Sequence, residues 1–152
     1  MHIKRIKMNL EGIISITGKT GLFKLVSKVN NTVIVENLAD KKRMPITARY
    51  QANSLNEIGI YTFEDTKPLS EIFDIIAKKE NAKQGISHKV DKEELIKYFE
   101  EILPNYDVEK VYISDMRKVI QWYNAMQTAG LIELPQDEKK TTKKKVTAEK
   151  EN

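Results

Sequence analysis

The sequence contains no cysteine and only two histidines, His2 and His88, among its 152 residues. The absence of cysteine excludes structural disulfides, thiolate zinc sites, iron–sulfur clusters and thiol catalysis. His88 lies in a polar stretch beside Lys89, and no second imidazole lies within ligand spacing, which favours a surface histidine over a metal ligand. We therefore expect no bound metal ion and no cofactor.

The sequence also lacks long apolar runs. None approaches the ~18 residues of a membrane-spanning helix, and the basic start of the chain meets Asn9 and Glu11 rather than a signal-peptide core. We expect no membrane partner and a cytoplasmic setting. With 40% hydrophobic and 32% charged residues, the chain still has enough apolar side chains to fold around a core.

The charge is unevenly distributed along the chain. Residues 1–66 hold 10 basic and 6 acidic side chains, residues 67–134 hold 10 and 12, and residues 135–152 hold 6 and 4. The formal net charge of +4 therefore comes from the two ends of the chain. This mild excess permits an anionic partner without requiring one.

A change in hydrophobic periodicity divides the chain. Apolar side chains recur every second position up to about Thr66, and every third or fourth position after Pro68. We expect an α+β protein with a small β-barrel domain over residues 1–66 and a helical domain over residues 67–134. Residues 135–152 are rich in lysine and poor in apolar side chains, which predicts a disordered tail.

The first region reads as four or five short strands. Ile14 and Ile16 alternate with polar residues, residues 18–21 have the composition of a turn, and Asn30–Asn31 suits a type I′ hairpin. Apolar residues at 58–63 predict a last strand. So few short strands protect their edges most economically by closing, which predicts an SH3-like barrel.

Basic side chains of this first region form the main candidate site. Phe23, Leu25 and Val29 are expected on one face of a strand, with Lys24 and Lys28 on the other. Such a face could contact phosphates without reading sequence, although scattered lysines also commonly protect exposed strand edges. The candidate nucleic-acid-binding residues are Lys19, Lys24, Lys28, Lys41, Lys42 and Arg43.

The second region predicts three helices. The first places Pro68 in its opening turn, and the second starts at Asp91, which can cap it, with Glu94 completing a capping box. Ser114 is the expected cap of the third helix, and Gly130 predicts a Schellman-type end. The predicted buried stripes are Leu69, Ile72, Phe73 and Ile76 in the first helix, and Met116, Val119, Ile120, Tyr123 and Met126 in the third.

Gly18-Lys19-Thr20 resembles the end of a phosphate-binding P-loop, but its spacing is wrong. That motif needs four residues between its first glycine and Gly-Lys, and Gly12 leaves five. Residues 18–21 also fit the Gly-x-x-Gly clamp of KH domains, which joins two helices. Because the flanking residues alternate like strands, a glycine-bounded turn is the better interpretation.

No residues stand out as catalytic. The carboxylates of Glu93-Glu94 and Glu100-Glu101 are scattered around the polar face of one helix, and Ser15 is flanked by isoleucines rather than by the glycines of a nucleophile elbow. We expect a protein that is not an enzyme.

Trp122 lies at the margin of the third helix's apolar stripe, so it could seal the junction between the two regions or anchor a partner. We keep it as a candidate partner-binding residue. The lysines at 139–145 could attract RNA, DNA or ribosomes, or only solubilise the tail.

Two stretches carry a resemblance to a known family: residues 10–27 (LEGIISITGKTGLFKLVS), and residues 111–115 (VYISD) running into 118–124 (KVIQWYN). Over about residues 8 to 134 the chain resembles an uncharacterised bacteroidete family known only as a domain of unknown function. The resemblance implies a small β-barrel-like part, a helical part and a bacterial cytoplasmic setting, with no catalytic or ligand residues to carry over. Family members begin near Met8, so residues 1–7 are expected to be an extension or a misassigned start.

The sequence therefore predicts a non-enzymatic binding module that contacts nucleic acid or a nucleoprotein through the basic face of the barrel. The alternative is a protein adaptor or a homodimer that works through the helical domain.

Overall fold

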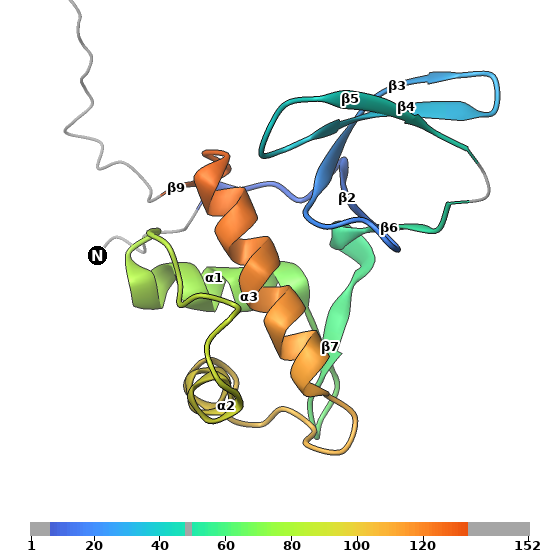
Figure 1. Cartoon of the computed structure of the whole chain (residues 1–152). Coiled ribbons are helices and arrows are strands. Elements are labelled where there is room, and N and C mark those ends of the chain that lie inside the picture. Colours follow the sequence, from blue (N-terminus) through green and yellow to red (C-terminus); the bar gives the residue numbers. More distant parts are fainter. Residues whose placement is uncertain (1–6, 48–49, 134–152) are drawn as a thin grey trace, which may run out of the picture.

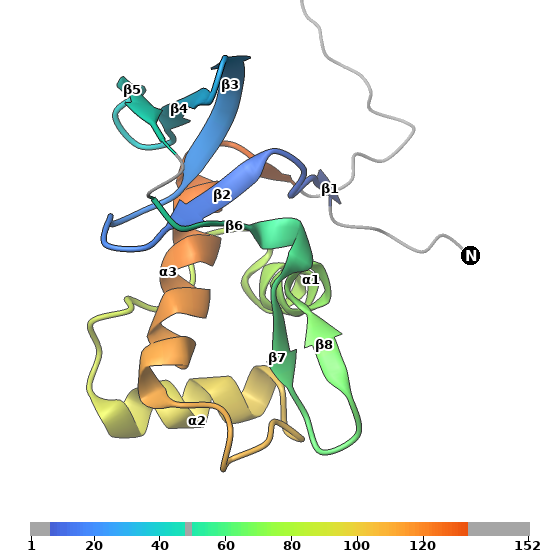
Figure 2. The same ribbon diagram turned by 90° about the vertical axis from the view of Figure 1, so that its right-hand side faces the viewer.

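The computed structural model describes residues 7–47 and 50–133. Its architecture is α+β, with an antiparallel sheet above and three helices below (Figures 1 and 2). Residues 1–6 and the predicted tail at 135–152 lie outside the described residues. Within the described ranges, no helix is long and apolar enough to cross a membrane.

The main sheet is antiparallel, has five strands and is open. Its order is β5-β4-β3-β2-β6, and among the described residues no pairing joins the edge strands β5 and β6. The closed SH3-like barrel is therefore not confirmed. Pro45 in β5 has no N–H to donate, which suits an edge strand. The strands are β2 (Ile13–Ile16), β3 (Phe23–Val29), β4 (Thr32–Asn37), β5 (Arg43–Ile46) and β6 (Ala52–Ser54).

Two smaller sheets complete the strands. β7 (Gly59–Tyr61) is the expected last strand, but it pairs with β8 (Thr66–Pro68) instead of joining the main sheet. The hydroxyl of Thr62 donates to the carbonyl of Asp65 at 2.8 Å, which stabilises the turn between these strands. β1 (Lys7–Met8) pairs with β9 (Ile132–Glu133) and joins the two ends of the described chain.

The β3–β4 hairpin contains a bulge that changes which side chains share a face. Lys24 lies opposite Glu36 and Lys28 lies opposite Val33, with a register shift between these pairs. Glu36 and Val33 are three residues apart on β4, so they point to opposite faces. The prediction that Lys24 and Lys28 share a face is wrong, because the bulge adds one residue and reverses the alternation. The hairpin loop is confirmed at Asn30–Asn31, but only Asn30 has a positive φ, 56°, so the turn is not type I′.

The helices are α1 (Leu69–Glu80), α2 (Lys92–Ile102) and α3 (Ile113–Thr128), with a short 3₁₀ helix, η1, at Leu55–Glu57. The predicted stripes of α1 and α3 are buried. Asp91 caps α2 by accepting the amide of Glu94 at 2.9 Å. The expected Schellman end of α3 is present, because Gly130 has a φ of +78° and the amide of Leu131 donates to the carbonyl of Met126 at 2.9 Å.

The start of α3 differs from the prediction. The helix begins at Ile113, one residue before Ser114, so Ser114 lies inside the first turn and cannot cap it. Asp115 reaches back instead, and its carboxylate accepts the amide of Tyr112 at 2.9 Å. The N-cap is Tyr112, and Asp115 stands at the third helical position, from which an acidic side chain can accept the N-cap amide.

One hydrophobic cluster joins the sheet to all three helices. It contains Leu10, Ile13, Leu22, Leu38 and Leu55 from the first part of the chain, and it continues into the helix stripes without a break. A smaller cluster fills the other side of the sheet, with Ile14, Ile16, Phe23, Val35 and Ile46. The core is therefore continuous across residue 66, and the domain division placed there stays a prediction.

We expect Asp91→Ala to lower the free energy of unfolding by about 1 kcal/mol, because the amide of Glu94 loses its acceptor. Ser114→Ala is the matched control, since Ser114 is exposed and caps nothing; its effect should stay within about 0.5 kcal/mol. Urea denaturation of both variants measures the difference. If the two variants lose equal free energy of unfolding, Asp91 does not cap α2 more effectively than Ser114 caps α3.

Two buried tyrosines tie the end of α1 to the other helices. The hydroxyl of Tyr98 donates to Glu80 at 2.6 Å, and that of Tyr123 donates to the carbonyl of Lys83 at 2.8 Å. Burial raises the pKa of Tyr123 to about 12. Burial and the hydrogen bond to Glu80 raise the pKa of Tyr98 even further above its usual value.

These shifts predict alkaline sensitivity. Both tyrosines hold their protons more tightly in the folded chain than in the unfolded chain, whose tyrosine pKa is about 10. Their stabilising effect is thus complete below about pH 10. The part due to Tyr123 is lost as the pH rises through about 12, and the part due to Tyr98 is lost at still higher pH. We expect Tyr123→Phe to reduce the loss of unfolding free energy between about pH 9 and pH 11.5, measured by urea denaturation. If Tyr123→Phe loses as much unfolding free energy over this pH range as the unmodified protein, Tyr123 is not a source of the alkaline sensitivity.

Candidate functional site

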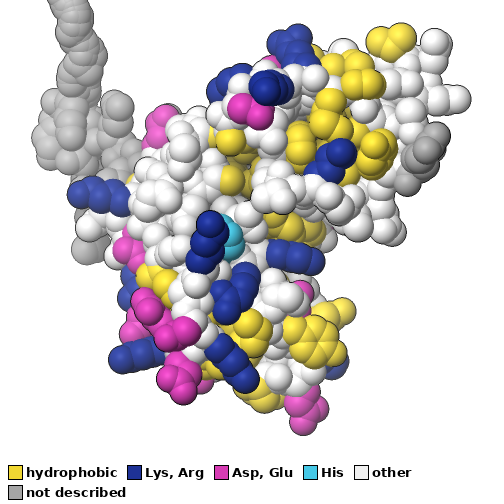
Figure 3. Space-filling model, viewed as in Figure 1, with side chains coloured by type: hydrophobic (Ala, Val, Ile, Leu, Met, Phe, Trp, Pro, Cys, Tyr) yellow, Lys and Arg dark blue, Asp and Glu magenta, His cyan; other side chains and the backbone are white. Residues whose placement is uncertain are grey.

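A groove of about 380 Å³ lies where the sheet meets α3. Seen as in Figure 1, hydrophobic and Lys or Arg side chains lie together in this region (Figure 3). We call it the Trp122 groove. Residues before β7 contribute Ser15, Ile16, residues 17–21, Asn53 and Ile58, and α3 contributes Lys118, Gln121 and Trp122.

The glycine-bounded turn forms one wall of the groove. The amide of Lys19 donates to the carbonyl of Ile16 at 3.0 Å, and Gly18 supplies the positive φ, +88°, that the third position of a type II turn requires. The amide of Thr17 donates to the carbonyl of Gln51 at 2.9 Å, which ties the turn to the residues leading into β6. Because this turn joins two strands, its amides do not begin a helix, as those of a P-loop do.

One face of α3 forms the opposite wall. Lys118 and Trp122 are four residues apart and therefore project from the same side of the helix. Trp122 is half-buried and packs against the main core, so its ring is held in place while its outer part lines the groove. The neighbouring Arg117 donates instead to the carbonyls of His88 and Val90, at 2.6 and 2.8 Å.

The groove favours a negatively charged ligand. Lys19 and Lys118 line it from opposite walls, and no acidic side chain is among its lining residues. The Nζ of Lys19 lies 5.2 Å from the ring centroid of Tyr50, within the range of a cation–π interaction. Hydroxyls of Thr17 and Thr20, like the neighbouring amide side chains, add uncharged hydrogen-bonding groups.

A second hollow of about 200 Å³ continues the groove along α3. It shares Ile58, Lys118 and Trp122 with the first and adds Tyr61 and Lys110. Asp115 also lines it, so the two hollows together carry three lysines and one carboxylate. That carboxylate already accepts the amide of Tyr112.

Backbone pairing brings Lys110 to this hollow. The amide of Asp107 donates to the carbonyl of Tyr61, and the amide of Phe63 donates to the carbonyl of Asn105, both at 3.0 Å. These bonds hold the segment before α3 against β7. As a result the Nζ of Lys110 lies 5.2 Å from the ring centroid of Tyr61.

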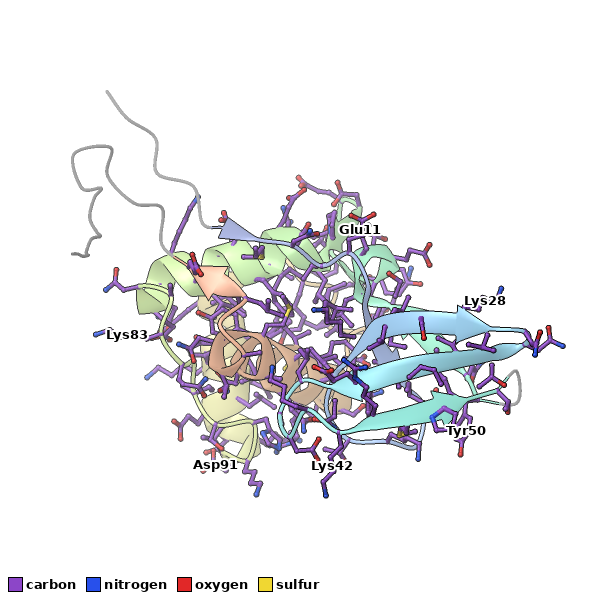
Figure 4. The ribbon with its side chains drawn as sticks, turned by 90° about the horizontal axis from the view of Figure 1, so that it is seen from above. Glu11, Lys28, Lys42, Tyr50, Lys83 and Asp91 are labelled. Carbon is purple, nitrogen blue, oxygen red and sulfur yellow. The ribbon has the colours of Figure 1, made fainter. Side chains whose placement is uncertain are left out.

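Most of the predicted basic residues do not meet. Lys28 lies toward the β3–β4 loop and Lys42 lies at the opposite end of β4, as Figure 4 shows. Lys24 shares a row with Glu36 and Arg43, and the Nε of Arg43 contacts Glu36 at 3.0 Å, which offsets part of the positive charge. Lys41, with a φ of 65°, occupies the turn before Lys42.

Two predicted residues do meet, Lys19 and Trp122, which the sequence placed in separate candidate sites. Sequence reasoning missed Lys118 and Lys110. It considered Tyr61 as an aromatic platform but set it aside because core packing explained it equally well, whereas the ring is 52% exposed. The spacing of Lys118 and Trp122 outside the apolar stripe was an available signal for one of them. No local signal pairs Lys110 with Tyr61, because that contact depends on long-range backbone bonds. Among the residues that the structure describes, no group of three or more His, Asp or Glu side chains is placed to hold a metal ion.

Comparisons with known proteins match this chain to two domains of unknown function and to a solved structure from a bacteroidete. Two family models match, each described as a domain of unknown function: DUF5606 over residues 10–55 and DUF6852 over residues 58–126. A solution NMR structure of a protein from Bacteroides vulgatus, solved by a structural genomics consortium, is 42% identical, with a TM-score of 0.67. The match covers 80% of this chain and 88% of that chain.

The chain belongs to this uncharacterised bacteroidete family, which confirms the resemblance seen in the sequence. No protein of curated function matches it. The Trp122 groove takes one wall from the region matched by the first family model and the other wall from the region matched by the second.

Proposed function

We propose that the protein is a non-enzymatic, cytoplasmic binding module that holds nucleic acid, free or within a nucleoprotein, in the Trp122 groove. The observation that supports this best is the convergence of Lys19 and Lys118 on Trp122, with no acidic side chain in the lining. Lysines that contact phosphates supply most of the affinity of non-specific nucleic-acid binding. The proposal moves the predicted interface from the outer face of the sheet to its junction with α3.

The groove also has the fixed walls that a binding site requires. The turn is tied to the residues leading into β6, and Trp122 is packed against the core. A ligand therefore meets a backbone turn and a tryptophan ring that are already held in place, which lowers the entropic cost of binding.

Charge reversal tests this location. We expect Lys19→Glu and Lys118→Glu each to weaken binding of a labelled oligonucleotide by on the order of tenfold at low salt, measured by fluorescence anisotropy. Lys28→Glu is the matched control, because it makes the same change in charge on an exposed residue away from the groove.

Two results would contradict the proposal. No binding at about 50 mM salt would remove nucleic acid as the ligand. If Lys24→Glu, Lys28→Glu and Lys41→Glu weaken binding while Lys19→Glu and Lys118→Glu do not, the nucleic acid binds the outer face of the sheet instead.

A second candidate is self-association through an exposed apolar surface near β7. Phe63, Val108 and Tyr112 are 66%, 62% and 66% exposed, and the hydrogen bond from Phe63 to Asn105 joins the two segments that carry them. Exposed apolar residues gathered in one region are typical of protein interfaces. This surface supports the homodimer alternative more specifically than the helix stripes, which are buried.

If this surface forms a dimer, sedimentation equilibrium should give twice the mass of one chain, and Phe63→Asp should return the monomer mass. Val26→Asp, which introduces the same charge on β3 away from this surface, should leave the dimer intact. A monomer at all soluble concentrations of the unmodified protein would exclude the dimer.

A further inference from the structure

Three aromatic side chains along the junction each lie near a lysine. Tyr50 and Lys19 form one pair and Tyr61 and Lys110 another, each with the Nζ 5.2 Å from the ring centroid. Between them, α3 presents Trp122 with Lys118 four residues before it. Tyr50 is 40% exposed and Tyr61 is 52% exposed, so both rings have surface to offer.

The three pairs follow one another along a continuous surface. Lys19 and Trp122 line the Trp122 groove, and Trp122 and Lys118 also line the second hollow. That hollow extends to Tyr61 and Lys110. The order is therefore Tyr50 with Lys19, then Trp122 with Lys118, then Tyr61 with Lys110.

This alternation of rings and cations matches the chemistry of an unpaired strand. In a duplex the base faces are stacked on one another, so a protein ring has no base to stack on. A single strand exposes both its bases and its phosphates, and proteins that bind it combine aromatic platforms with a basic groove. Lysines alone would fit any polyanion, but exposed rings that alternate with lysines favour a polyanion that also carries planar groups.

We propose that this surface binds single-stranded nucleic acid, with bases stacking at Tyr50, Trp122 and Tyr61 while the three lysines contact phosphates. The inference rests on the proposed function and adds the form of the nucleic acid. Asp115 is the one acidic side chain lining the path, and its carboxylate is engaged by the amide of Tyr112. Stacking accepts every base, so sequence preference should be weak.

The chain provides its own reporter, because Trp122 is its only tryptophan. Titration with oligothymidine of about four, eight and twelve nucleotides should quench Trp122 emission, and affinity should rise with length. A duplex of the longest length should bind on the order of tenfold more weakly than the single strand, since it offers phosphates without free bases.

Substitutions at the two ends separate stacking from charge. Tyr61→Ala and Tyr50→Ala should each weaken binding of the longest single strand about tenfold, with little change in its salt dependence. Lys110→Gln should lower the salt slope, log Kd against log salt, by about 0.7. Phe63→Ala is the matched control, because this exposed ring lies two residues from Tyr61 but lines neither hollow. Tyr61→Phe should retain affinity, since the ring remains.

The outcomes distinguish the two proposals. If duplex and single strand bind equally and the tyrosine variants have no effect, while Lys19→Glu still weakens binding by on the order of tenfold, the single-strand inference is wrong and the groove remains a nucleic-acid site. If no nucleic acid quenches Trp122 at about 50 mM salt, both proposals fail. Circular dichroism of each variant establishes that a loss of affinity is not a loss of fold.

Discussion

The packing of the sheet against the three helices is the constraint on which the rest of the structure depends. Leu22 and Leu55, at 1% and 0% exposure, belong to the same cluster as Phe73, Ile120 and Tyr123. Burying each such side chain stabilises the fold by about 1.5–3 kcal/mol. This shared core fixes the turn at residues 17–21 opposite Trp122, so the groove exists only while both parts of the chain are packed together.

β2 is the strand that carries this constraint to the site. Ile13 points into the main cluster, whereas Ile14 and Ile16 point into the smaller cluster on the other side of the sheet. A strand that is buried on both faces cannot slip by one residue without exposing one set of side chains. The turn that follows β2 is therefore held by packing at its base as well as by its own hydrogen bonds.

The sequence predicted best what depends on local periodicity and local caps. The stripes of α1 and α3, the cap at Asp91 and the end at Gly130 all follow from residues within a few positions of each other. One local prediction failed, the cap at Ser114, because Asp115 accepts the amide of Tyr112 instead. The other failures arose where pairing between strands decides the outcome. The bulge in β3 separated Lys24 from Lys28, and the pairing of β7 with β8 left the main sheet open. Only part of the candidate site could be predicted from the sequence. Lys19 and Trp122 could be singled out, but no local pattern indicated that they line the same groove.

Helix α3 combines three tasks on three faces. Its apolar stripe enters the core, Lys118 and Trp122 face the groove, and Arg117 and Asn124 bond the segment between α1 and α2. Asn124 accepts the amide of Gly85 at 2.7 Å and donates to the carbonyl of Ile86 at 2.9 Å.

The segment between α1 and α2 begins with Asn81 and Ala82 at positive φ. This conformation costs free energy in residues other than glycine and persists where surrounding contacts hold it. Polar residues of α3 that look like an ordinary solvated face thus fix a loop, which explains how adjacent Arg117 and Lys118 have unrelated roles. Of these two neighbouring cations, Lys118 faces a hollow, whereas the guanidinium of Arg117 is bonded to backbone carbonyls.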